Sequence, residues 1–218
     1  MISQFVVIGL GRFGQSLAIN LARAGHSVLG IDLDESILAE LSVDLDAVVA
    51  ADATDEAALR ELQVDRMETA IVSIGMESMQ ASILATALLR QLGVPRIVAR
   101  SLTTLHSRVL VAVGAHTVIN PEAEVGRRLA LELADPGVLR RYELSGDVSL
   151  AELALPPAFV EKTIAELRLP EEKGITVLAI RRGSEVKPIQ SVTETLREND
   201  RLIVTGSDDA VRRLAEVR

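Results

Sequence analysis

The sequence predicts an α/β protein in which an N-terminal, Rossmann-like, doubly wound parallel sheet is followed by a small α+β domain. Three observations support this fold class. Short apolar runs alternate with amphipathic helical stretches over residues 1–135. A glycine-rich loop, Gly9-Leu10-Gly11-Arg12-Phe13-Gly14, directly follows the first run. The rhythm then changes from residue 147 onward, and the glycine loop is not repeated there.

Six apolar runs are expected to form the strands of the first domain. They are the ranges 5–9, 27–32, 47–52, 69–75, 96–100 and 116–120. The amphipathic stretches between them include 13–24, 55–62, 80–92 and 104–113. Six βα units in this rhythm predict the strand order 3-2-1-4-5-6. A ligand crevice would then lie at the carboxyl ends of the first and fourth strands, where the order reverses.

A sixth helix is expected over 122–134. Asn120 is a good N-cap, and Pro121 is favoured at a first helical position. The turn signal Asp135-Pro136-Gly137 ends this helix. The predicted boundaries are therefore 1–135 for a nucleotide-binding domain, 136–143 for a connector and 144–218 for a second domain.

The second domain is expected to contain three strands and two helices. The ranges 148–155, 174–182 and 201–205 are predicted strands, and we expect 174–182 to be buried on both faces. Thr163 and Glu166 have the spacing of a capping box that opens a short helix. A capped C-terminal helix is predicted over 207–217.

Composition excludes several classes of site and partner. The 218 residues include no cysteine, which removes disulfides, Cys-ligated zinc sites and thiol nucleophiles. The net charge of −8 argues against nucleic acid and against an anionic membrane surface as partners. No apolar run reaches the ~18 residues of a membrane span. The chain also enters its first strand without a basic leader, so we expect a cytoplasmic protein.

The glycine loop predicts a nucleotide-binding site. Gly9 permits a tight turn, Gly11 lets the backbone approach a pyrophosphate, and Gly14 lets the following helix pack closely on the strand. The N-terminus of that helix offers free N–H groups and a positive dipole end to the anion. Asp32 follows at about the ~20-residue offset expected for an acceptor of ribose hydroxyl groups. An acid at this position disfavours a 2′-phosphate and therefore NADP.

Further candidates lie at the ends of the other strands. Asp34 is either a second ribose contact or the N-cap of a helix over 35–41. Asp52 accepts from an adenine amine, or else Asp52 or Thr54 caps a helix. Arg100 either reaches the crevice or lies on the surface. The remaining candidate cofactor-binding residues of this group are Ala53, Ser73, Ile74 and Gly75.

Two charged residues have a functional and a structural interpretation. Arg12, inside the loop, is either solvent-facing or a phosphate clamp. As a clamp, its natural target is a phosphate in a neighbouring subunit, because within one chain its side chain would point away from the pyrophosphate. Glu122, at the start of the sixth helix, is either an acid that stabilises the helix dipole or a metal-bridging carboxylate near phosphates.

We expect no catalytic residue in this chain. The histidines His26, His106 and His116 are scattered and are not paired at metal-ligand spacing. Tyr142 has no lysine four residues later, and the sequence has neither a GxSxG elbow nor a Walker lysine. A nucleotide site without an acid, base or nucleophile indicates sensing. The alternatives are an NAD(H)-dependent oxidoreductase with a small C-terminal substrate domain and a redox-sensing repressor, which would need a basic DNA-binding module that this chain lacks.

Five segments occur along the chain in a distinctive order. They are Gly9-Leu10-Gly11-Arg12-Phe13-Gly14, Ile31-Asp32-Leu33-Asp34, Ala51-Asp52-Ala53-Thr54, Val72-Ser73-Ile74-Gly75 and Gly114-Ala115-His116-Thr117-Val118-Ile119-Asn120-Pro121-Glu122. Together with 161–167 and 174–183 of the second domain, they resemble the RCK family of cytoplasmic regulators of K⁺ conductance. The resemblance is greatest to KtrA/TrkA-type gating subunits and covers the whole chain.

The resemblance implies a ring, usually an octamer built as a tetramer of dimers, docked on a membrane K⁺-translocating subunit at the inner face of the membrane. Members bind ATP, ADP or NAD(H) in the N-terminal (TrkA-N) domain, and ligand exchange gates the pore. Arg12 is then expected to contact the phosphate of the nucleotide in the partner subunit. Because ADP lacks a γ-phosphate, we expect ATP to favour the conducting state.

Two further ligands are implied by the resemblance alone. Glu122 would bind Mg²⁺, Ca²⁺ or Na⁺ at a dimer interface. The C-terminal (TrkA-C) domain binds cyclic di-AMP in some members, and the comparable stretch here includes Ile175, Ile180, Arg181 and Pro188. Arg100 stands where close relatives often have lysine, which leaves the choice of nucleotide open.

Overall fold

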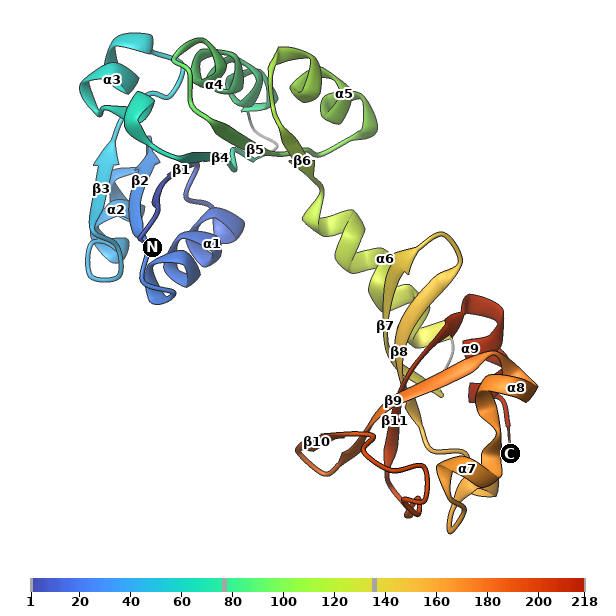
Figure 1. Ribbon diagram of the computed structural model, residues 1–218. Coiled ribbons are helices and arrows are strands. Elements are labelled where there is room, and N and C mark those ends of the chain that lie inside the picture. The colour runs from blue at the N-terminus through green and yellow to red at the C-terminus, as the bar shows by residue number, and fades with distance from the viewer. Residues whose placement is uncertain (1, 76–77, 135–136, 218) are drawn as a thin grey trace. The chain divides into compact units, whose positions relative to one another are not determined.

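The chain forms two compact units, Met1–Pro121 and Glu122–Arg218 (Figure 1). The structure is a computed structural model that describes residues 2–75, 78–134 and 137–217. The predicted turn at Asp135-Pro136, and with it the end of the first predicted domain, lies outside the described residues.

The first unit contains a six-stranded parallel sheet. Its strands are β1 (Gln4–Ile8), β2 (Ser27–Asp32), β3 (Ala47–Ala50), β4 (Thr69–Val72), β5 (Arg96–Arg100) and β6 (Thr117–Ile119). Their order is β3-β2-β1-β4-β5-β6, which confirms the predicted order. In the register of the sheet, Ile8 lies opposite Ile31 on β2 and Val72 on β4. These neighbouring strands therefore end at one common edge.

Helices cover both faces of this sheet, as the alternation of side chains along the strands requires. Val6 and Ile8 face one core cluster, and Val7 faces the other. The first cluster packs under α3 (Glu56–Glu61), α4 (Met79–Gln91) and α5 (Thr104–Val113), and the second under α1 (Arg12–Arg23) and α2 (Glu35–Leu41) (Figure 1). A short 3₁₀ turn, η1 (Val64–Arg66), precedes β4.

The second unit contains a five-stranded antiparallel sheet in the order β10-β9-β11-β8-β7. Its strands are β7 (Val138–Ser145), β8 (Val148–Ala154), β9 (Ile175–Arg182), β10 (Glu185–Pro188) and β11 (Arg201–Ser207). Its helical segments are α6 (Pro121–Ala134), η3 (Pro157–Phe159), α7 (Ile164–Leu167), α8 (Leu169–Lys173) and α9 (Asp208–Ala215). One apolar core joins α7, α8 and α9 to the sheet through residues such as Leu167, Leu169, Leu202 and Leu214.

Several local expectations for this unit are confirmed, and two are wrong. The Thr163–Glu166 capping box opens α7, and Ser207 caps α9. The stretch expected to be a connector instead contributes most of strand β7. Strand β9 is not buried on both faces, because its outward side chains, such as Leu178 at 44% exposure, lie at the surface of the chain.

Candidate functional site

A cleft of about 550 Å³ lies where the strands of the parallel sheet end. This volume is typical of small-molecule sites. The lining comes from the ends of the first five strands and from the start of α4, and most of the predicted binding residues are in it. Those that line it are Gly9, Gly11, Asp32, Asp34, Asp52, Ala53, Thr54, Ser73, Ile74, Gly75 and Arg100.

The three glycines of the loop are in different steric situations. Gly9 has a φ of +89°, and a Cβ atom there would lie 2.8 Å from the Ile74 nitrogen. A Cβ on Gly14 would lie 2.0 Å from the Gly9 carbonyl oxygen, so only glycine lets α1 approach the strand this closely. Apart from the residues next to it in the chain and the backbone of α1, no atom of the described residues lies within 4 Å of a Cβ built on Gly11, which leaves open space beside the loop on the lining of the cleft.

The N-terminus of α1, like that of α4, lacks a side-chain cap among the described residues, whereas those of α2, α3 and α5 have one. Gly11 is the N-cap of α1, no side chain in the described ranges caps it, and the first turn holds no acidic residue. By contrast, α2, α3 and α5 are capped by the side chains of Asp34, Asp55 and Thr103. The orphan N–H groups and the positive dipole end of α1 are therefore left for an anion.

Asp32 is held by the backbone on both carboxylate oxygens. Its Oδ2 accepts from the Leu10 N–H at 2.5 Å, and its Oδ1 accepts from the Asp34 N–H at 3.0 Å. Each carboxylate oxygen has a second lone pair that can accept from a ribose hydroxyl. The sequence analysis predicted the ribose contact but missed the bond to Leu10, which fixes Asp32 relative to the glycine loop. Backbone contacts of this kind leave no signal in the sequence.

Asp34 and Asp52 both form local turns. Asp34 accepts from the Ser36 N–H at 2.9 Å and from the Ser36 hydroxyl at 2.6 Å, which confirms its expected capping role. Asp52 accepts from the Thr54 N–H at 2.8 Å and from its hydroxyl at 2.7 Å. The expectation that Asp52 or Thr54 caps a helix is wrong, because Asp55 caps α3. Hydrogen bonds from Ser36 and from Thr54 lower the pKa values of Asp34 and Asp52, so both carboxylates remain charged near neutrality.

The far side of the cleft carries a cation and a buried hydroxyl. The guanidinium carbon of Arg100 lies 5.8 Å from the centre of the Phe13 ring, so the end of β5 contacts the first turn of α1. Ser73 is 2% exposed, and its Oγ has no hydrogen-bond partner among the described residues. An unpaired hydroxyl on the lining is a group that a polar ligand would satisfy.

Four predicted residues do not line the cleft. Phe13 and Gly14 lie in the first turn of α1. Arg12 is exposed on the same turn, and Glu122 is exposed and belongs to the second unit. Among the described residues, no group of three or more histidine, cysteine or acidic side chains is arranged to hold a metal ion. The roles predicted for Arg12 and Glu122 therefore remain predictions.

Each histidine accepts a hydrogen bond from the backbone. The Nδ1 atoms of His26, His106 and His116 accept from the N–H groups of Ser3, Leu102 and Ile97 at 3.3, 3.3 and 2.9 Å. None of the three lines the cleft. Within the described ranges, no helix is both long and apolar enough to cross a membrane.

In the second unit, the stretch implied for cyclic di-AMP is built partly into the core. Ile175 and Ile180 are 0% and 2% exposed within this chain, and the Arg181 Nε donates to Glu152 at 2.8 Å. Pro188 lines a shallow hollow beside β10.

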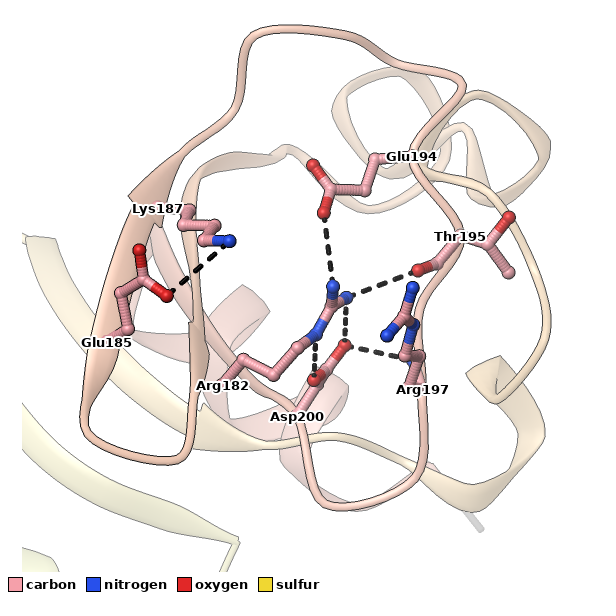
Figure 2. Close-up of polar contacts among 7 residues, drawn as sticks. All are labelled: Arg182, Glu185, Lys187, Glu194, Thr195, Arg197 and Asp200. Atoms are coloured by element: carbon pink, nitrogen blue, oxygen red, sulfur yellow. Dashed lines mark hydrogen bonds and ion pairs between the residues drawn. The ribbon is translucent and has the colours of Figure 1, made fainter.

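A polar network next to this hollow ties the end of β9 to the loop that precedes β11 (Figure 2). Arg182 donates from two nitrogens to Asp200 at 2.8 Å each, and it also reaches Glu194. Burial raises the pKa of Asp200, but the bonds from Arg182 and from the Arg197 N–H outweigh burial and lower it overall. Lys187 pairs with Glu185 on β10 (Figure 2).

Comparison with known proteins gives two family matches. Residues 5–121 match the TrkA-N domain, and residues 149–217 match the TrkA-C domain. The chain is 37% identical over 207 residues to Ktr system potassium uptake protein C of Bacillus subtilis, covering 95% of this chain and 93% of the relative. It is 35% identical over 210 residues to Ktr system potassium uptake protein A of the same organism, covering 96% and 94%.

Solved structures give the same fold. A GsuK RCK domain matches with a TM-score of 0.69 at 19% identity, over 99% of this chain and 48% of that one. The GsuK channel bound to NAD matches at 28% identity with a TM-score of 0.53, over 99% of this chain and 38% of that one. GsuK bound to ADP matches at 32% identity with a TM-score of 0.51, over 62% and 34%. The chain therefore spans less than half the length of each of these solved chains.

Proposed function

This chain belongs to the family of TrkA-N and TrkA-C domain proteins that includes the Ktr potassium uptake proteins, and we propose that it is the nucleotide-sensing regulatory subunit of a potassium uptake system. In this role it works in the cytoplasm and assembles as a ring, an octamer built from dimers. The ring docks on a membrane K⁺-translocating subunit and sets its conductance according to the nucleotide bound.

The observation that carries this proposal is the uncapped start of α1 beside a fixed carboxylate. An anion at the N–H groups near Gly11 and a ribose at Asp32 are two adjoining parts of an adenosine phosphate. None of the three histidines lines the cleft, and each accepts a backbone hydrogen bond. Since none of these histidines is placed to exchange a proton with a ligand in the cleft, the site is better suited to binding a nucleotide than to catalysing hydride transfer.

We assign ATP and ADP as the ligands that matter, with NAD(H) as the alternative. Asp32 disfavours a 2′-phosphate, and relatives of known structure have been described with NAD and with ADP. A ligand shifts the ring only by its difference in affinity for the two states. Arg12, exposed beside the loop, is suited to grip a γ-phosphate held by the partner subunit, which ADP does not offer.

Two ion and ligand roles complete the proposal. Glu122 binds Mg²⁺, Ca²⁺ or Na⁺ at the dimer interface, next to the nucleotide phosphates. Cyclic di-AMP acts through the C-terminal domain. Because Ile175 and Ile180 are buried in the core, Arg181 and Pro188 are the residues of that stretch that remain available to this ligand.

The test is a calorimetric series on the purified full chain with ATP, ADP, NADH, NADPH and cyclic di-AMP. We expect tight binding of ATP and ADP, weak binding of NADPH, and a size-exclusion mass near eight protomers. Reconstitution with the K⁺-translocating subunit should give faster K⁺ flux with ATP than with ADP. Equal flux with both nucleotides, or turnover of NADH by the chain alone, would contradict the proposal.

A further inference from the structure

His106 is buried outside the cleft and connects two helices. It lies in the first turn of α5, is 1% exposed, and places its Nε2 2.9 Å from the hydroxyl of Ser82 on α4. Its Nδ1 receives the Leu102 N–H, so that nitrogen is unprotonated and Nε2 carries the proton. The Ser82 hydroxyl, accepting from Nε2, then donates to the Met79 carbonyl at 2.9 Å.

This chain of hydrogen bonds joins two parts of the cleft wall. Met79 is the first residue of α4, and its neighbours Ser78 and Ala81 line the cleft. Leu102 lies two residues beyond Arg100, the cation that ends β5 and lines the cleft from the other side. The helices α4 and α5 pack against each other on one face of the sheet (Figure 1).

The surroundings of these hydrogen bonds are mostly apolar, apart from the buried Thr86, whose hydroxyl donates to the Ser82 carbonyl at 2.7 Å. Ala85, Leu89 and Leu110 of the same two helices are fully buried in the core cluster. An apolar side chain at position 106 would fill the space and keep the helices together. It would, however, leave the Ser82 hydroxyl and the Leu102 N–H without their present partner, and hydrogen bonds, unlike apolar contacts, fix a direction. The start of α4 also lacks a side-chain cap that would hold it by other means.

We propose that His106 is a positioning residue for the nucleotide cleft. Through Ser82 and Leu102 it sets the start of α4 relative to the end of β5, and so the separation of Ser78 and Arg100 across the bound ligand. This inference rests on the proposed nucleotide-binding function. The new element is that the affinity for the nucleotide depends on a buried polar bridge, the hydrogen bonds of His106 with Ser82 and Leu102, which does not contact the ligand.

The experiment compares three variants of the full chain by calorimetry with ADP, at a temperature where thermal unfolding shows each to be folded. His106→Leu removes the bridge and Ser82→Ala removes its middle link. His106→Gln keeps an amide N–H that can reach the position of Nε2. We expect His106→Leu and Ser82→Ala each to weaken ADP binding about 3- to 10-fold, the scale of one or two lost hydrogen bonds. The double variant should be no weaker than the worse single one, because both act on one bridge.

Two controls separate positioning from general stability. His106→Gln should bind ADP more tightly than His106→Leu, although neither has the imidazole. Leu110→Val, in the same buried cluster, should lower the unfolding temperature and leave the Kd for ADP unchanged. If His106→Leu fails to fold, Ser82→Ala, which changes the core volume little, decides the question.

The outcomes distinguish this inference from the proposed function. Wild-type affinity for ADP in Ser82→Ala and in folded His106→Leu would overturn the positioning role and leave the nucleotide site intact. A loss of affinity in Leu110→Val as large as in His106→Leu would also overturn it. No binding of any adenosine nucleotide by the wild-type chain would overturn the proposed function first, and the inference with it.

Discussion

Asp32→Asn is the substitution that tests the nucleotide site most directly. Asp32 accepts two backbone hydrogen bonds, from Leu10 at 2.5 Å and from Asp34 at 3.0 Å. An asparagine of the same shape has one oxygen and one NH₂ group. Whichever way it is oriented, one of the two backbone N–H groups then faces another donor, and the negative charge is lost.

The magnitudes follow from these two changes. An unpaired backbone donor costs about 1–3 kcal/mol of folding free energy. Weakening a charge-assisted bond to a ribose hydroxyl costs about 1.5–3 kcal/mol of binding free energy, or roughly 10- to 100-fold in Kd. NADPH should respond in the opposite direction to NADH, because the variant no longer repels a 2′-phosphate. The ratio of the two affinities is therefore a sharper readout than either alone.

The assay is calorimetry with ADP, NADH and NADPH, together with urea unfolding of each variant. Asp46→Asn is the matched control, since Asp46 also accepts a backbone hydrogen bond, from Val28 at 3.2 Å, but does not line the cleft. Because an asparagine at position 46 can still turn its one oxygen toward the Val28 N–H, Asp46→Asn removes a charge outside the cleft and should leave the Kd for ADP unchanged. The reasoning is refuted if Asp32→Asn keeps the wild-type Kd for ADP, or if Asp46→Asn weakens ADP to the same extent.

Four further predictions concern other positions. Gly14→Ala should lower the free energy of unfolding by at least ~1–3 kcal/mol in urea denaturation, since its Cβ would lie 2.0 Å from a backbone oxygen. Gly11→Ala should unfold like the wild type and lose only nucleotide affinity, measured by calorimetry. Arg12→Ala should weaken ATP more than ADP, and equal losses in calorimetry would count against a clamp between subunits. With ATP present, we expect divalent ions to raise the unfolding temperature of the wild type in a thermal-shift assay but not that of Glu122→Gln, and an equal ion response in both would remove Glu122 from the site. Burial lowers the pKa of His106 below 6.5, so as the pH falls the unfolded chain is protonated at this residue before the folded chain. The free energy of unfolding therefore decreases as the pH drops from 6.5 through the folded-state pKa. Urea unfolding at pH 7.5 and 5.5 should show a smaller decrease in His106→Gln than in the wild type.

The sheet and most of the cleft could be predicted because their determinants are local. Buried strands such as β1 and β4 each contain an uninterrupted apolar run, and Gly14 is required by a contact with Gly9 within one βα unit. In contrast, β10 is exposed along its whole length and β7 is exposed at most of its positions, so no hydrophobic pattern marks them. Each is an edge strand whose existence depends on pairing with β9 or β8.

The site residues divide in the same way. Asp32 could be predicted from its spacing after the loop. Its hydrogen bond from the Leu10 N–H could not, because that bond depends on the backbone geometry and not on the residue type at position 10. The helix cap at Asp55, rather than at Asp52 or Thr54, depends on where the chain leaves β3. Arg12 and Glu122 could not be placed from one chain, because the roles predicted for them need a second one.

The strand order of the sheet determines how charged residues are distributed along the cleft. Read across the sheet edge from β3 to β5, the cleft first presents Asp52, then Asp32 and Asp34, then the start of α1, and finally Arg100. One end is therefore anionic and the other cationic, with the glycine loop between them. At the ~8 Å screening length of physiological salt, this gradient acts within the cleft itself. For the nucleotide that we propose as the ligand, this gradient favours phosphates toward the loop and the sugar toward the acids, so that the topology of the sheet would orient the ligand as well as hold it.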